Sequence, residues 1–421
     1  MPPPMNKRDF VRTAGAASLG LFLTDRLLAQ YAGVPATAVA DDEAFWLAIR
    51  GTYRLKPDYI NLENGYYSMQ SEEVLEAFIG RVRDVNREAS YYLRTRQYED
   101  KAAVRAKLAA IAGCAPEELI ITRNTTESLD TVIAGYDWKP GDEAVMAEQD
   151  YGAMVEMFAL QARRYGLVNR VISLPNDPQS DDEIVQLYER AITSKTRLLM
   201  TGHVVNITGQ VLPVRKICDM AHRHGVAVMV DGAHAFAQLD YRIPDLQCEF
   251  YAASLHKWLG APLGAGILYV RRDQVAKLWP IYADSSVPDD DIRKLNHTGT
   301  HPVHTDLAIN DAIVFHERIG IRRKEARLRY LQTYWTSRLR GTPRLVFNTP
   351  SDPKRTCAIA NVGVSGMDPA VLARTLLDKY KIWTVAINRP GVQGVRITPQ
   401  LFTTPAELDT LVRALKEIAA A

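Results

Sequence analysis

Short apolar runs alternate with amphipathic stretches through most of the chain. The apolar runs, which favour β-strands, read ELIITR, DEAVMAE, RVISL, TRLLMTGHV, VAVMVDG, EFYAASLH and GAGILYVRR. Stretches with helical periodicity cover residues 72–88, 99–113, 125–135, 151–165, 180–194 and 213–224. Strands separated by helices are typical of a mainly parallel sheet that is covered by helices on both faces. The pattern therefore predicts an α/β fold in which these seven strands form one large domain.

The pattern changes after about residue 305. A long helical stretch covers 305–340, two or three strands follow, and an amphipathic helix covers 405–420. This order predicts a smaller α+β domain at the C-terminus. The predicted divisions are an export signal at 1–40, a segment at 41–70 that contributes to the small domain and to the entrance of the site, a large domain at 71–304, and a small domain at 305–421.

The N-terminus has the layout of a cleaved export signal. A basic start, MNKRDF, precedes an apolar run rich in small residues, and ATAVA follows near residue 40. The apolar run is too short to span a bilayer permanently, so no membrane span is expected in the mature form. KRDF resembles a twin-arginine signal in which Lys7 replaces the first arginine. We therefore expect the export machinery as a partner and a periplasmic location. The alternative is an N-terminal arm of a cytoplasmic protein.

Charge and cysteine content narrow the possible partners. The 421 residues include 51 Lys and Arg against 49 Asp and Glu, a formal net charge of +2. This balance gives no reason to expect nucleic acid or an anionic membrane as a partner. The cysteines are far apart and show no CxxC spacing, so they are interpreted as buried thiols and not as a metal site or a disulfide framework; they are Cys114, Cys218, Cys248 and Cys357.

Polar residues follow the predicted strands, where ligands bind in open α/β sheets. Asn124, Thr125 and Thr126 lead from one strand into a helix, and the N–H groups of a helix start suit a phosphate. The alternative is that Asn124 or Thr125 is only a helix N-cap. The other polar or aromatic residues at strand ends are Tyr151, His203, Asn206, Thr208, Asp231, His234, Ser254, His256 and Lys257.

Asp231 and Lys257 carry the most specific chemistry. Asp231 ends an apolar strand, where a carboxylate is costly unless it meets a cation or a strong donor. A salt bridge between the two is one interpretation. The other is that Asp231 pairs with a protonated pyridine nitrogen while Lys257 holds an aldehyde as a Schiff base, because lysine loses its proton readily on burial. With a phosphate at Thr125, Thr126, Ser254 and His256, these groups describe pyridoxal 5′-phosphate (PLP).

The motif VDGAHA followed by SLHK resembles the class V aminotransferase family of fold-type I PLP-dependent enzymes, and its isopenicillin N epimerase-like sub-group in particular. The resemblance covers roughly residues 58–405. It implies a seven-stranded sheet and a homodimer in which two subunits share each active site.

The resemblance also implies roles for individual residues. Lys257 would form the Schiff base and shuttle the α-proton, and Asp231 would bind the pyridine nitrogen. The remaining cofactor contacts would be Asn206 at the ring 3-oxygen, His234 at the ring edge, Tyr151 on the ring face, Thr125, Thr126, Ser254 and His256 at the phosphate, and Thr300 at the phosphate of the neighbouring subunit.

Two residues are expected at the substrate. Arg396, in GVRITPQ, would bind a substrate carboxylate through paired hydrogen bonds. The alternative is a surface arginine in a salt bridge. Asn64, in NLENGYY, would line the mouth of the site together with Gly65.

The expected activity is aminotransfer or epimerisation at the amino-bearing carbon of an amino acid, peptide or other amino metabolite, through an external aldimine and a quinonoid. PLP-dependent lyase chemistry, such as C–S elimination or decarboxylation, is the alternative, and a non-catalytic scaffold is a remote one. A desulfurase that forms a persulfide is disfavoured, because KIWTVAINRPGVQGVR, the region before Arg396, contains no cysteine. No glycine-rich nucleotide motif opens a strand–helix unit.

Overall fold

A computed structural model describes residues 28, 30, 31 and 33–421. The basic and apolar part of the expected export signal lies outside these residues. The last part of the expected signal belongs to the folded body, because Val39, in a short 3₁₀ helix at Ala36–Val39, is fully buried in the core. Asp42 caps the following helix, α2 (Glu43–Arg50), and accepts a hydrogen bond from the Tyr31 hydroxyl. The fold therefore begins before residue 41.

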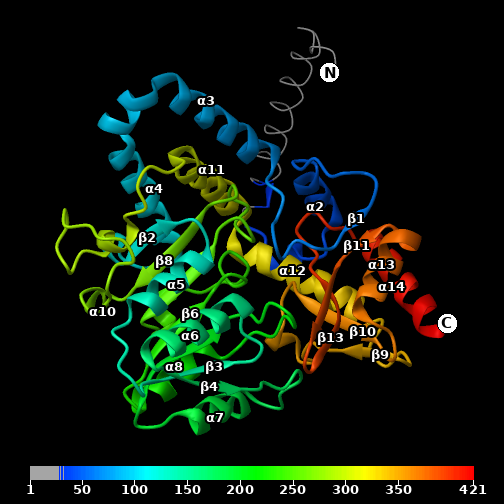
Figure 1. Ribbon diagram of the computed structural model, residues 1–421. Coiled ribbons are helices and arrows are strands. Elements are labelled where there is room, and N and C mark those ends of the chain that lie inside the picture. Colours follow the sequence, from blue (N-terminus) through cyan, green and yellow to red (C-terminus); the bar gives the residue numbers. More distant parts are fainter. Residues whose placement is uncertain (1–27, 29, 32) are drawn as a thin grey trace.

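A seven-stranded sheet forms the centre of the large domain (Figure 1). In spatial order its strands are β2 (Leu119–Thr122), β8 (Gly266–Val270), β7 (Phe250–Ser254), β6 (Ala227–Asp231), β5 (Thr196–Gly202), β3 (Glu143–Ala147) and β4 (Val168–Ile172). All neighbours pair in parallel except β8, which is antiparallel to both β7 and β2. The predicted mainly parallel sheet is confirmed.

Side chains alternate between the two faces of this sheet, and each face is covered by helices. One face packs against α5 (Thr125–Gly135) and α6 (Gly152–Tyr165). The other packs against α4 (Gln97–Ala112), α7 (Asp181–Ala191), α8 (Val214–Arg223) and α11 (Val303–Ile319). The long α3 (Glu72–Thr95) extends from the body toward α4 and packs along α11 (Figure 1). Two short helices, α9 (Ile243–Leu246) and α10 (Arg272–Val275), complete this domain.

The long helical stretch expected at 305–340 is two helices. α11 ends at Ile319 and α12 (Ile321–Thr336) begins after Gly320, whose φ of 88° breaks the helical path. Such a positive φ is readily adopted by glycine. The expected boundary after residue 304 is not a break in packing, because α11 and Leu328 of α12 lie in the large-domain core.

A second core holds the small domain. Its antiparallel sheet has four strands, more than the two or three expected, in the order β12 (Val385–Arg389), β13 (Val392–Ile397), β10 (Ala360–Val364) and β9 (Leu345–Phe347). It packs with α12, α13 (Pro369–Tyr380) and α14 (Pro405–Ala420). The N-terminal β1 (Ile60–Asn61) pairs in parallel with β11 (Ile382–Trp383), which places the segment after α2 against this domain.

Gly266 has no side chain and so allows the start of β8 to lie very close to the main chain at the start of α5. A Cβ built at this position would lie 2.7 Å from the Cα and N atoms of Asn124. We expect Gly266→Ala to lower the free energy of unfolding by about 1–3 kcal/mol because the backbone must move apart. Chemical denaturation monitored by circular dichroism measures this change.

The matched control for this substitution is Gly80→Ala in α3. A Cβ at Gly80 has no neighbour within 4 Å, and alanine favours a helix over glycine by about 1 kcal/mol. An unchanged stability in Gly266→Ala would contradict the proposed close packing.

Candidate active site

The carboxyl ends of three neighbouring strands bring the key side chains together. β6 pairs in parallel with β5 on one side and with β7 on the other, so the three strands end at the same edge of the sheet. Asp231 is the last residue of β6, Ser254 is the last residue of β7, and Lys257 follows shortly after. The topology therefore explains why these residues, distant in sequence, form one site.

Lys257 lies next to His234, and the contact of His234 with Trp258 determines which ring nitrogen carries the proton. The Lys257 Nζ atom is 3.2 Å from His234 Nε2, and the Trp258 indole N–H donates to His234 Nδ1 at 3.4 Å. An indole nitrogen only donates, so Nδ1 must be the acceptor and the ring proton lies on Nε2. Burial holds the pKa of His234 well below its usual value, so the ring is neutral. The Nε2–H group therefore faces Lys257 and favours the free amine there.

Burial also acts on Lys257 directly. It lowers the pKa of this ammonium from 10.5 to about 8, and Arg396 contributes in the same direction, while Asp231 and Glu63 oppose the shift. A lysine with such a pKa is a free amine in about a tenth of molecules at pH 7, far more than an ordinary lysine. Such an amine can attack an aldehyde and can accept a proton.

Asp231 retains one carboxylate oxygen for a ligand. Its Oδ1 atom accepts a hydrogen bond from the Ala233 N–H at 2.9 Å. No salt bridge joins it to Lys257, although burial raises the pKa of Asp231 and the charge of Lys257 lowers it. The structure thus disfavours the simple salt-bridge interpretation. A buried carboxylate with an unused oxygen matches the protonated ring nitrogen of PLP.

A second group of polar atoms lies at the N-terminus of α5. The Ser254 hydroxyl lies 2.9 Å from the Thr125 nitrogen and 2.8 Å from its hydroxyl oxygen. Asn124 caps the helix by accepting from the Glu127 N–H, so the N-cap interpretation is also correct. His256 Nδ1 is buried without a protein partner. Hydroxyls, a helix start and an unpaired imidazole nitrogen together fit a phosphate.

The structure places Tyr151, Asn206 and Thr300 as follows. Tyr151 precedes α6 at the end of β3 and is exposed, which leaves its ring face accessible. The main-chain oxygen of Asn206 accepts a hydrogen bond from Arg396 Nη1 at 3.1 Å, which puts Asn206 at the same site. Thr300 is exposed on the loop before α11, and its contact with a neighbouring subunit stays a prediction. Thr126, in the first turn of α5, is partly buried and stays a predicted phosphate contact.

Arg396 lies close enough to Lys257 for its charge to lower the pKa of that amine, as expected for a site residue, but its ion pair was not expected. It is buried and forms an ion pair with Glu63, with 2.6 Å between Nη2 and Oε1. Asn64 does not line the mouth of the site, because its side chain is fully buried and donates to the Thr398 oxygen at 2.8 Å. Gly65 instead packs against Arg396, since a Cβ there would lie 3.1 Å from the guanidinium carbon.

Two polar residues of the site, Asp150 and Glu63, were missed as functional residues. Asp150 is partly buried in the turn after β3, where it accepts from the N–H groups of Ala147 at 2.8 Å and Gly202 at 3.1 Å. Burial raises its pKa to about 7, and the nearby charge of Asp231 adds to the shift. The position of Asp150 directly before Tyr151 was a usable signal. Glu63 gave no such signal, because its partner Arg396 lies in a distant strand.

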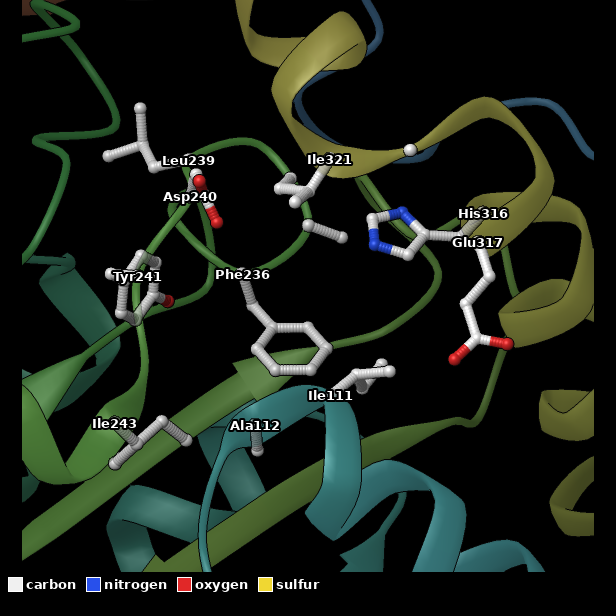
Figure 2. A pocket seen from close by; sticks show the side chains of 12 residues that line it. Ile111, Ala112, Phe236, Leu239, Asp240, Tyr241, Ile243, His316, Glu317 and Ile321 are labelled. Atoms are coloured by element: carbon white, nitrogen blue, oxygen red, sulfur yellow. The ribbon is translucent and has the colours of Figure 1, made fainter. Parts of the chain in front are cut away.

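A separate cavity of about 380 Å³ lies between α4, the segment after β6 and the junction of α11 and α12 (Figure 2). Its lining includes Phe236, Tyr241 and His316 but not Lys257 or Asp231. His316 Nδ1 lies 3.0 Å from the buried amine of Lys324, which donates to the Trp258 oxygen at 2.8 Å. This chain of contacts runs from the cavity to the residue after Lys257.

The sequence was compared with known families and proteins. Residues 67–414 match the sequence model of the family "Aminotransferase class-V". The chain belongs to the class V aminotransferase family. It is 34% identical to the isopenicillin N epimerase of Amycolatopsis lactamdurans over 333 residues, 75% of this chain and 84% of that protein. It is 29% identical to the isopenicillin N epimerase of Streptomyces clavuligerus over 90% of this chain and 98% of that protein.

More distant relatives have other activities in their names. A probable cysteine desulfurase of Halobacterium salinarum is 28% identical over 86% of this chain and 91% of that protein. Among solved structures, the cysteine desulfurase of Thermococcus onnurineus covers 88% of this chain, with 97% of its own chain aligned, a TM-score of 0.78 and 21% identity. The cystine C–S lyase C-DES covers 86% of this chain and 97% of its own, with a TM-score of 0.77 and 21% identity. These likenesses confirm the fold-type I architecture.

PLP is the cofactor of this class V enzyme. A solved structure of a C-DES variant, with a TM-score of 0.78 to this chain, carries glycine covalently linked to PLP. The residues of the chain fit the cofactor: an amine at Lys257, an unused carboxylate oxygen at Asp231 and an anion site at Thr125 and Ser254. The reaction takes place at the amino-bearing carbon of the substrate.

Burial of Lys257 makes the stability of the cofactor-free protein depend on pH. Between pH 8 and 10.5 the unfolded chain binds more protons at this residue than the native chain, so the free energy of unfolding rises with pH in this range. Below about pH 8 Lys257 is protonated in the native chain, so the free energy of unfolding is lowered by the full cost of burying this ammonium. We expect the difference in unfolding free energy between wild type and Lys257→Met to change by about 3 kcal/mol across this range.

Denaturant titrations at several pH values measure that difference. Lys139→Met, which removes an exposed lysine, is the control for the loss of a lysine as such. Parallel pH profiles of wild type and Lys257→Met would show that Lys257 is not held in a desolvating site.

Proposed function

We propose that this class V enzyme catalyses aminotransfer or epimerisation at the amino-bearing carbon of an amino acid or of an amino-bearing peptide or metabolite. The observation that carries the proposal is the buried Lys257 amine, which lies 3.2 Å from neutral His234 and whose pKa is influenced by the charge of nearby Asp231. Such an amine can remove a proton from the substrate carbon and return it. The relatives named isopenicillin N epimerase support proton return at carbon as the outcome.

The residues of the chain divide the work between binding and proton transfer. When bound, PLP supplies an electron-withdrawing ring that weakens the bonds to the amino-bearing carbon. Asp231 would keep the ring nitrogen protonated, and Thr125, Ser254 and His256 would hold the phosphate. Asn206 and Tyr151 would orient the ring, and Lys257 would move the proton.

The thiols of the chain argue against a persulfide mechanism. Burial is the main cause that raises the pKa of Cys114 and of Cys357 to about 12, and it also raises the pKa of Cys218 and Cys248. A thiol with a raised pKa is a poor nucleophile at neutral pH because the thiolate is the reactive form. A second candidate function remains, namely C–S elimination without a cysteine nucleophile. The fold shared with the lyase C-DES favours it.

We also propose that the protein is an exported homodimer. The basic and apolar N-terminus supports export to the periplasm, and the exposed loop that carries Thr300 supports a contact with a second subunit. Light scattering measures the oligomeric state, and cell fractionation measures the location. A monomeric protein, or one found only in the cytoplasm, would contradict the respective part of this proposal.

We expect Lys257→Ala to lose the covalent attachment of PLP. The wild-type protein treated with borohydride should yield a peptide in which PLP is fixed on Lys257, because reduction makes the carbon–nitrogen bond permanent. Mass spectrometry of a digest detects this peptide. Its presence on another lysine, or its persistence in the variant, would disprove the assignment.

Asp231→Ala should separate cofactor binding from catalysis. The phosphate contacts remain, so we expect PLP to stay bound, while turnover falls about a hundredfold or more through the loss of charge stabilisation at the ring. PLP content and turnover are measured on the same preparation. A variant with wild-type turnover would exclude the pairing of Asp231 with the ring nitrogen.

The reaction type is decided by incubating the PLP-loaded protein with amino acids and short peptides in deuterated water. Epimerisation gives the substrate with inverted configuration and deuterium at the amino-bearing carbon. Transfer to a 2-oxo acid moves the amino group, and elimination releases ammonia with sulfide or another leaving group. Mass spectrometry and chiral chromatography identify the product.

A further inference from the structure

The cavity that Figure 2 shows is separate from the active site and large enough for a small organic ligand. Its volume is about 380 Å³, within the range of ligand pockets in proteins. The ring of Phe236 lies between Asp240 and Tyr241 on one side and His316 and Glu317 on the other. The segment after β6 and the junction of α11 and α12 thus form two facing walls.

Charge distinguishes this cavity from a simple packing defect. Asp240 and Glu317 carry carboxylates, and no lysine or arginine is among the described residues that line it. Arg322 pairs with Asp240 at 3.0 Å, whereas Glu317 is exposed and forms no ion pair within the described part of the chain. Behind the wall, burial lowers the pKa of the Lys324 amine to about 7, which weakens the opposing charge. The cavity therefore favours a cation.

The other side chains of the lining favour a cation with an apolar body. The aromatic rings of Phe236 and Tyr241 line the cavity, and the face of such a ring attracts an ammonium group within about 6 Å. Ile111, Ile243 and Ile321 provide apolar contact for the rest of a ligand. This combination fits an alkylammonium or arylammonium compound.

One chain of contacts leads from the cavity to the residue after Asp231. The hydroxyls of Tyr241 and Tyr251 are hydrogen-bonded, and Tyr251 donates to the Gly232 oxygen at 3.3 Å. A hydroxyl has one proton, so Tyr241 is the donor to Tyr251. The contact is close, because a Cβ at Gly232 would lie 1.8 Å from the Tyr251 oxygen. A shift of Tyr241 is therefore passed to the main chain next to Asp231.

A second chain leads to the residue after Lys257. His316 Nδ1 lies 3.0 Å from Lys324 Nζ, and Lys324 donates to the Trp258 oxygen at 2.8 Å. The exposed fractions of His316 and Lys324 are 7% and 3%, so water hardly competes for these contacts. The two chains connect the cavity with the main chain beside both residues on which the cofactor chemistry depends.

We propose that this cavity is a second ligand site, which binds a small organic cation with an apolar body and alters the surroundings of Lys257 through Tyr241 and His316. The site does not depend on the proposed reaction, because its lining contains none of the residues assigned to the cofactor or to the substrate. Its ligand is a regulator and not a substrate.

Benzyltrimethylammonium is the probe, because it joins a permanent charge to an aromatic ring and, as a quaternary ammonium ion, cannot form a Schiff base. Isothermal titration calorimetry of the PLP-loaded protein measures its dissociation constant, with benzyl alcohol as the uncharged comparison. We expect the cation to bind about fivefold or more tightly than the alcohol. High salt should reduce this advantage, because it screens the attraction to the carboxylates.

Two variants locate the binding. Ile321→Trp fills the cavity and should weaken the binding of both compounds about tenfold or more. Glu317→Gln removes one exposed carboxylate, so it should weaken the binding of the cation about two- to fivefold and leave that of benzyl alcohol unchanged. The matched control is Glu99→Gln, which removes an exposed glutamate at the opposite end of α4 from Ile111 and should bind both compounds as wild type does.

Coupling to the active site is measured by the absorbance of bound PLP. A saturating concentration of the probe should change this absorbance in the wild type, although the probe cannot react with PLP. Tyr241→Phe keeps the ring and should bind the probe within about twofold of the wild type, with a smaller change in absorbance. Lys324→Met interrupts the other chain and should also reduce the change at saturation.

Each part of the proposal can fail on its own. Absence of binding to the wild type, or equal affinity of wild type and Ile321→Trp, would overturn the site. Equal affinities for the cation and the alcohol would overturn the class of ligand. Binding without a change in PLP absorbance would refute the coupling to Lys257. Binding that appears only after removal of residues 1–27, or only on dilution of the protein, would make the N-terminal segment or a second subunit the occupant and would overturn the proposal.

Discussion

Burial of one lysine amine at the edge of the parallel sheet is the constraint on which the site depends. An ammonium ion is costly to remove from water, and the surroundings of Lys257 compensate for that cost only in part. Asp231 is near but forms no salt bridge, Arg396 opposes the charge, and His234 offers a hydrogen-bond donor in place of an acceptor. The environment therefore lowers the pKa of the amine to about 8 and so increases the share of the neutral form, which is the form that can bond to an aldehyde.

The neighbouring residues follow from this constraint. In neutral His234 the Nδ1 atom is a hydrogen-bond acceptor, and the indole N–H of Trp258 donates to it. Trp258 directly follows Lys257, so the reactive residue and the group that sets the histidine tautomer share one short segment. Its geometry is held by β7 on one side and by the buried amine of Lys324 on the other.

The sequence was sufficient to predict the sheet and the cofactor chemistry. Buried parallel strands are continuous apolar runs, and a polar residue that ends such a run stands out, as Asp231 and Ser254 do. The break at Gly320 was missed because the apolar pattern continues across it and only the backbone angle changes. The pairing of Arg396 with Glu63 was missed for a different reason. It depends on the parallel bridge between Glu63 and Thr398, which no local pattern encodes. Asn64 was assigned to the mouth of the site, although this bridge turns it inward.

α12 connects the two cores of the molecule. Its Leu328 packs in the large-domain core and its Leu331 in the small-domain core. Lys324 on the same helix donates a hydrogen bond to the main-chain oxygen of Trp258, the residue after Lys257. α12 therefore contacts both cores and the main chain beside Lys257, so a displacement of this helix would be transmitted directly to the segment that carries the amine.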